Sequence, residues 1–161
     1  MIRDVVFPSD SRELKRLIYE YVDWLGIDLS YQDFQGEMAT IEALFSLPSG
    51  QYTFAIENGG VAGGVGFRRL DEHTAEIKRL YVRQGYQGMG LGRQLMENLL
   101  SKLKSLGYRR VVLDAVPPTT KARLLYERMG FTEIEPYFHN PVPGTKFYGI
   151  GLEDGTGASE A

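Results

Sequence analysis

The stretch Gln87-Gly88-Met89-Gly90-Leu91-Gly92 decides the fold, because it ends a strand-like segment and opens an amphipathic helix. Its closely spaced glycines allow the backbone to turn tightly and to come close to a ligand. The helix that follows directs its first N–H groups, which lack carbonyl partners within the helix, back at the turn. Helix N-termini attract phosphate for this reason and because of the helix dipole. The stretch therefore predicts an anion-binding loop.

Two common phosphate-binding motifs do not fit this loop. A dinucleotide-binding fingerprint requires G-x-G-x-x-G, whereas the glycines here stand at 88, 90 and 92. A Walker A loop requires Gly-Lys-Ser/Thr, and Gly92 is followed by Arg93 and Gln94. Binding of a nucleotide phosphate without either motif stays open at this point.

Length and charge narrow the class of protein. A chain of 161 residues is long enough for one domain with a sizeable core, and we expect residues 1–153 to form it and residues 154–161 to be a disordered tail. The 18 Lys and Arg residues against 21 Asp and Glu residues give a net charge of −3, with no basic run suited to a nucleic-acid backbone. We therefore expect a small-molecule or peptide partner and no nucleic acid.

The absence of cysteine excludes disulfides, thiolate nucleophiles and cysteine-ligated zinc. No pair of His with Asp or Glu has the spacing of metal ligands, so we predict no metal. The N-terminus carries no signal-peptide core, and no apolar run approaches the roughly 18 residues of a membrane-spanning helix. A cytoplasmic protein that does not enter membranes is the resulting expectation.

Before the glycine loop, the pattern predicts helices followed by an antiparallel meander. We expect a strand over 2–7, and a helix over 11–25 that starts at a capping box of Asp10 and Glu13 and ends near Gly26. A loop over 28–36 and a helix over 37–46 follow. Strands over 51–57 and 61–70 flank Asn58-Gly59-Gly60, a hairpin turn, and a third strand covers 74–82.

After the loop, leucines at helical spacing predict a helix that Gly107 ends, and 109–116 reads as a strand. A strand–helix–strand crossover requires parallel strands, so the sheet is expected to be mixed, antiparallel first and parallel later. A helix over 119–129, capped by Gly130, and strands over 131–138 and 146–152 complete the chain.

Two motifs in order resemble the GNAT superfamily of N-acetyltransferases. Gln87, Gly90 and Gly92 match the Gln/Arg-x-x-Gly-x-Gly/Ala pattern of the family's acetyl-CoA loop. The segment 122–131 (ARLLYERMGF) is similar to the family's A-x-x-L-Y-x-x-x-G-F segment. The likeness covers about residues 60–150. It implies an α+β, three-layer fold in which a mixed, mainly antiparallel seven-stranded sheet carries helices on both faces.

The resemblance also implies acetyl-CoA as the cofactor and a set of residues that hold it. The pyrophosphate would lie on the loop, and the pantetheine arm would pair with the end of the preceding strand, where the sheet splays between its fourth and fifth strands. Thr120 replaces an asparagine that usually contacts the pantetheine, so its hydroxyl would have to make that contact. The implied cofactor-binding residues are Leu80, Tyr81, Val82, Gln87, Gly88, Met89, Gly90, Leu91, Gly92, Arg93, Thr120 and Tyr126.

Two catalytic roles follow from the resemblance. Tyr126 stands where many members carry a tyrosine that protonates the departing thiolate, although it could also be an ordinary packed aromatic residue. Glu76 stands where some members carry a glutamate that removes the amine proton through water, although it could also be a solvated strand residue. The implied activity is direct acetyl transfer from acetyl-CoA to a primary amine of a small molecule or peptide, without a covalent acyl-enzyme.

The acceptor and the assembly are less determined by the sequence. Asp23, Asp28 and Asp33 would favour a cationic acceptor if they face the cleft. Edge strands near the C-terminus could pair across a homodimer. A catalytically weak GNAT-type module that binds CoA for regulation is the alternative to an enzyme.

Overall fold

A computed structural model describes residues 1–152 of the chain, so the predicted tail over 154–161 lies outside the described residues. Its centre is a single seven-stranded sheet in the order β1-β2-β3-β4-β5-β7-β6. The strands are β1 (Ile2–Asp4), β2 (Gly50–Glu57), β3 (Gly60–Arg69), β4 (Thr74–Val82), β5 (Arg110–Ala115), β6 (Thr132–Ile134) and β7 (Lys146–Gly151). The predicted α+β class with a mixed, mainly antiparallel sheet is confirmed.

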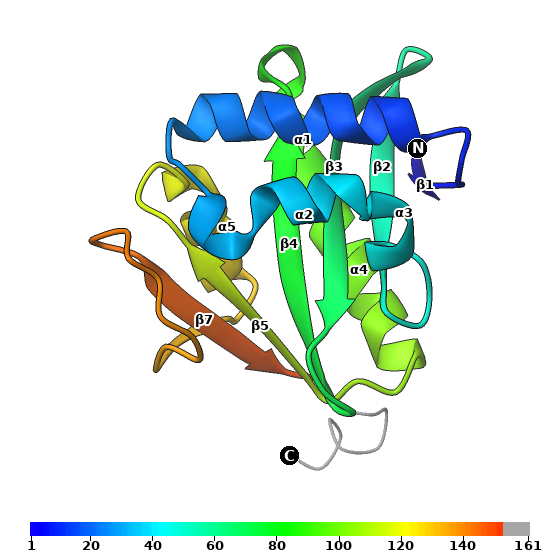
Figure 1. The fold of residues 1–161 in the computed structure, drawn as a ribbon. Helices are drawn as coiled ribbons and strands as arrows, with labels where there is room; N and C mark the ends of the chain where they lie inside the picture. Colours follow the sequence, from blue (N-terminus) through cyan, green and yellow to red (C-terminus); the bar gives the residue numbers. More distant parts are fainter. Residues whose placement is uncertain (153–161) are drawn as a thin grey trace.

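Helices cover both faces of this sheet (Figure 1). One face carries α1 (Ser11–Leu25), the 3-10 turn η1 (Ser30–Gln32), α2 (Phe34–Ala39) and α3 (Ile41–Leu44); the other carries α4 (Leu91–Ser105) and α5 (Thr120–Arg128). A second 3-10 turn, η2 (Gln84–Tyr86), precedes the glycine loop. Each face has its own core because each amphipathic helix buries one apolar side against the sheet.

The sheet contains one parallel strand pair. The hairpin β2–β3 and the pairs β1–β2 and β3–β4 are antiparallel, as predicted, and β4 pairs with β5 in parallel through the α4 crossover. The later pairs β5–β7 and β6–β7 are antiparallel, so the expectation of a parallel second half was wrong beyond β5. The reason is that β7 lies between β5 and β6 and runs antiparallel to both, so β5 and β6 do not pair directly.

The predicted capping box at α1 does not form. The Asp10 carboxylate accepts hydrogen bonds of 2.7 and 3.0 Å from Arg3 and one of 2.8 Å from the Val6 N–H, and makes no side-chain cap. A bidentate pair with a guanidinium is stronger than a single bond from a backbone N–H. The same pairing lowers the pKa of Asp10. The predicted end of the helix near Gly26 is confirmed, and Gly26 adopts the left-handed conformation with φ 66°.

Two predicted strands are shorter than expected, and the predicted loop over 28–36 was wrong in part, because it contains η1 and the start of α2 at Phe34. Strand β1 ends at Asp4, and β6 ends at Ile134, before Pro136, which has no N–H for a ladder. The predicted helix over 37–46 is two short helices that meet at Thr40, whose hydroxyl donates to the Gly36 carbonyl at 2.7 Å. Side chains that bond their own backbone compete with helix continuation, which accounts for the break.

Candidate active site

Strands β4 and β5 separate soon after they meet. Their pairing is confined to three residues, from Thr74 opposite Arg110 to Glu76 opposite Val112. Figure 1 shows β5 diverging from β4 toward the end of the sheet that α1 crosses. From Ile77 to Val82, β4 therefore pairs with β3 alone, and its other edge is left without a strand partner. The splay implied by the resemblance is present and exposes this edge.

A bulge in β4 lies within the splay. Arg79 has φ 60°, and the register between β3 and β4 shifts between Gly64 and Gly66. Because residues other than glycine rarely adopt positive φ, the bulge needs support from its surroundings. The Arg79 guanidinium pairs with the buried Glu37 at 2.6 and 3.1 Å, and the Arg79 carbonyl accepts a 2.8 Å bond from the Tyr52 hydroxyl. No pattern in the sequence indicated this bulge.

The glycine loop borders a groove of about 660 Å³ between the end of β4 and α5. Gly88 and Gly90 have φ of 85° and 78°, so the turn itself requires glycine there. Gly90 is the N-cap of α4. Among the described residues, Gln94 is the first after Gln87 whose backbone N–H donates to a carbonyl. The intervening N–H groups are thus free to bind an anion, as the sequence predicted.

Cationic side chains from two helices face the same groove. They are Arg93 on α4 and Lys121 and Arg128 on α5. Gln87 connects the end of β4 with α5. Its Nε2 donates to the Val82 carbonyl at 3.0 Å, and its Oε1 accepts from Lys121 at 3.1 Å. A groove with free N–H groups and three cations fits the phosphates of acetyl-CoA, and its lining by Leu80, Tyr81 and Val82 puts it beside the end of β4, where the pantetheine arm is expected.

Most residues that the resemblance implied for the cofactor line this groove. They are Leu80, Tyr81, Val82, Gln87, Gly88, Gly90, Leu91, Gly92, Arg93 and Thr120. Met89 does not line it, and its side chain is 50% exposed. Sequence reasoning missed Lys121 and Arg128, although basic residues on one helix beside a phosphate loop are a usable signal, and it did not single out Trp24 for this groove.

Tyr126 lies beside a second, smaller cavity in the splay, not in the groove. Its ring packs against Phe131 and Tyr148 at centroid distances of 5.7 and 6.2 Å. Within residues 1–152 its hydroxyl makes no hydrogen bond. Burial raises the pKa of Tyr126 well above the usual value near 10, so the hydroxyl stays protonated at neutral pH.

Glu76 is buried where β4 and β5 separate, and it lines neither cavity. One carboxylate oxygen accepts from Arg68 at 2.6 Å, and the other accepts from the Tyr137 hydroxyl at 2.6 Å. The carboxylate raises the pKa of Tyr137, as burial also does. Glu76 is therefore not the solvated strand residue of the alternative reading; its role as a base stays a prediction.

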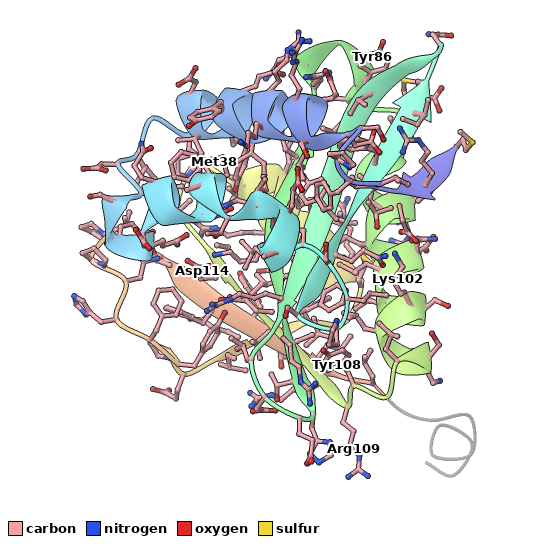
Figure 2. The ribbon with its side chains drawn as sticks, turned by 45° about the vertical axis from the view of Figure 1, so that its right-hand side comes forward. Met38, Tyr86, Lys102, Tyr108, Arg109 and Asp114 are labelled. Atoms are coloured by element: carbon pink, nitrogen blue, oxygen red, sulfur yellow. The ribbon has the colours of Figure 1, made fainter. Side chains whose placement is uncertain are left out.

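The small cavity in the splay is lined by polar groups that the sequence did not single out. Lys78 and Arg79 reach it from β4 and Asp114 from β5, while Tyr31 and Gln32 close it from η1. Asp114, labelled in Figure 2, interrupts the apolar run of β5 that begins at Val111, a pattern that could have marked it. Asp23, Asp28 and Asp33 line neither the cavity nor the groove. Leu80 and Tyr21 line both spaces.

The helices of residues 1–152 include none with the length and apolar character of a membrane span.

Comparison with known proteins gives the family. The model of the acetyltransferase (GNAT) family matches residues 18–131. An N-acetyltransferase of Schizosaccharomyces pombe is 33% identical over 155 residues, which are 91% of each chain. A GNAT-family acetyltransferase from Staphylococcus aureus superposes with a TM-score of 0.77 at 24% identity, over 95% of this chain and 100% of that one.

An acetyltransferase from Salmonella typhimurium, solved with its cofactor acetyl-CoA, superposes with a TM-score of 0.71 at 21% identity, over 96% of this chain and 94% of that one. These superpositions show that the chain shares its fold with solved acetyltransferases. The chain belongs to the GNAT family of acetyl-CoA-dependent acetyltransferases.

Proposed function

We propose that this enzyme transfers the acetyl group directly to a primary amine of a small molecule or peptide. One observation carries the proposal: the cofactor groove and the polar cavity in the splay meet at Leu80, beside the unpaired edge of β4. A cofactor along the groove would end where an acceptor in the cavity begins. Such proximity of two reactants is itself a large part of catalysis.

The protein holds the cofactor with backbone groups and cations. The N–H groups after Gln87 and the side chains of Lys121 and Arg128 bind its phosphates, and Thr120, which lines the groove, contacts the pantetheine through its hydroxyl in this proposal. Bound acetyl-CoA supplies an acetyl group activated as a thioester. An N–H on the open edge of β4, within Leu80–Val82, stabilises negative charge on the carbonyl oxygen, a contribution of about 3–4 kcal/mol in comparable sites.

Tyr126 is the proton donor in this proposal. Tyr126 lines the cavity, its hydroxyl is protonated at neutral pH as in any tyrosine, and it has no hydrogen bond within residues 1–152 that would have to be broken. Glu76 serves as the proton acceptor through water, at the point where β4 and β5 part. For it to act, Tyr137 or Arg68 must give up its bond to the carboxylate.

The test is steady release of the CoA thiol with a broad panel of amines, with the acetylated product identified by mass spectrometry. Tyr126→Phe should lower kcat by about 100-fold or more, the usual contribution of a general acid, without loss of stability. Tyr19→Phe is the matched control, because Tyr19 is 43% exposed on α1 and lines neither space. Binding of acetyl-CoA without release above hydrolysis for any amine would instead favour a regulatory CoA-binding module.

A further inference from the structure

Two opposite charges line the cavity in the splay without pairing with each other. Lys78 projects from β4 and Asp114 from β5, and both border the same space. Neither is among the ion pairs that the described residues form. Partly buried charges usually have a partner, because removal from water is costly for an isolated charge. The arrangement needs an explanation.

Lys78 has a weak partner. Its ammonium reaches the Oε1 of Gln32 at 3.5 Å, the upper limit of a hydrogen bond. Burial lowers the pKa of Lys78, and the neighbouring Arg79 lowers it further. An ammonium with three donors and one long bond retains donors for an anion.

Asp114 is held in place at one oxygen. Asn140, from the loop between β6 and β7, donates from Nδ2 to Asp114 Oδ2 at 2.9 Å and to the Tyr31 hydroxyl at 3.2 Å. The other oxygen, Oδ1, has no hydrogen-bond partner among residues 1–152. Burial raises the pKa of Asp114. One oxygen is thus anchored and the second is free to bind a cation.

The other charges near the cavity are already neutralised. Arg79 is paired with Glu37 at 2.6 Å, with both side chains 6% exposed. Glu76, which does not line the cavity, is paired with Arg68 at 2.6 Å. Lys78 and Asp114 are therefore the charged side chains of this cavity that form no ion pair within 4 Å among residues 1–152.

We propose that the acceptor is an amino-carboxylate, whose carboxylate binds Lys78 and whose ammonium binds Asp114 before acetylation. The inference rests on the proposed function and narrows its acceptor class. A cavity of about 40 Å³ holds roughly three water molecules at about 10–15 Å³ each, so it accommodates the charged head of an acceptor and leaves the rest outside. Lys78 and Asp114 are specificity-determining residues in this reading.

The experiment compares matched acceptors. Each α-, β- or γ-amino acid of a panel is assayed beside its carboxamide and beside the amine that lacks the carboxyl group, and the thiol release gives kcat/KM. The wild-type enzyme should prefer the carboxylate over the carboxamide by about tenfold or more, the usual effect of a hydrogen bond between charged groups.

Variants assign the preference to residues. Lys78→Met should bring the ratio of carboxylate to carboxamide close to one, and Lys78→Arg should restore part of it. Asp114→Asn should lower kcat/KM about tenfold or more for both members of a pair, because both carry the ammonium. Lys104→Met on α4 and Asp23→Asn on α1, both exposed and away from the cavity, should leave the ratio at the wild-type value.

The outcomes separate this inference from the proposed function. Turnover of amines with no preference for the carboxylate overturns the inference and leaves the acetyl transfer standing. If no amine is turned over, binding of amino acids to the CoA-loaded protein is measured by calorimetry. Binding that Lys78→Met abolishes supports the amino-carboxylate site and refutes the transfer. No binding refutes both. If Lys78→Met and Asp114→Asn lose stability but leave the ratio of carboxylate to carboxamide unchanged, the two charges have only a structural role and the inference is overturned.

Discussion

The hydroxyl of Tyr52 donates a 2.8 Å hydrogen bond to the carbonyl oxygen of Arg79, the residue of β4 with φ 60°. Both side chains are buried, so no water replaces this bond if it is lost. The bond connects β2 with the bulge across β3, and it holds the part of β4 that faces the splay. The shape of the active-site edge thus depends on a tyrosine outside the site.

Tyr52→Phe should therefore destabilise the protein and loosen the bulge. The buried carbonyl of Arg79 loses its donor, and we expect the free energy of unfolding to fall by about 1–3 kcal/mol. Urea unfolding measures this change. Tyr19→Phe on the exposed side of α1 should shift stability by less than about 0.5 kcal/mol. Equal stability of the two variants would contradict a supporting role for Tyr52.

The buried pair of Glu37 and Arg79 should be intolerant of losing one partner. Glu37→Ala leaves the guanidinium buried without a counter-charge, and we expect a loss of about 3–5 kcal/mol. The exposed pair of Arg93 and Glu97 provides the comparison, since Glu97→Ala should cost less than about 1 kcal/mol. Thermal unfolding of both variants is the measurement, and similar losses would show that burial is not what gives the Glu37 pair its importance.

Gly66 provides space for aromatic rings beneath β3. A methyl group there would lie 2.6 Å from Tyr52 and 2.8 Å from Phe45, so Gly66→Ala should destabilise by about 1–3 kcal/mol through overpacking. Gly151→Ala in β7 is the matched control, because nothing lies within 4 Å of the added carbon and φ is not positive. A neutral Gly66→Ala, measured by chemical unfolding, would mean that the Tyr52 ring moves freely.

The loop glycines should differ from one another. Gly90 has φ 78°, so Gly90→Ala forces an L-residue into the left-handed region, at about 1–2 kcal/mol, and disturbs the N–H groups that bind phosphate. Gly92 is helical, and an added carbon would make an ordinary 3.5 Å contact with Leu125. Unfolding and acetyl-CoA binding, measured together, should both worsen in Gly90→Ala, while Gly92→Ala should retain its stability.

Buried tyrosines should make the protein sensitive to alkali. Burial raises the pKa of Tyr21 to about 12, and burial together with Glu20 raises that of Tyr81 to about 12. Folded-state values above the unfolded value near 10 mean that the unfolded chain loses these protons first. Their contribution to stability is complete below pH about 10 and is lost as pH rises toward 12.

Tyrosinate absorbance at 295 nm, followed with urea unfolding from pH 8 to 11, checks this expectation. The tyrosines whose pKa is raised should ionise only as the protein unfolds. Full ionisation near pH 10 with the fold intact would contradict the assignment.

The elements that follow from local pattern were predictable from the sequence. Periodicity and turn residues, which are local properties of the chain, predict three features. These are the hairpin at Asn58-Gly59-Gly60, the helix after the glycine loop and the helix ends at Gly26 and Gly130. The glycine loop with its following helix and the segment around Tyr126 also carried the family resemblance. The position expected for the cofactor could therefore be located from the sequence alone.

What only the tertiary structure decided involves contacts between distant segments. Asp10 pairs with Arg3 and does not cap α1, and Glu76 is a buried partner of Arg68 and of Tyr137, which is 61 residues away, because side chains brought together by the fold offered stronger bonds than the local backbone or water. The insertion of β7 beside β5 likewise came from packing. The cavity with Lys78 and Asp114 arises where two strands part, and a divergence between strands has no local sequence pattern.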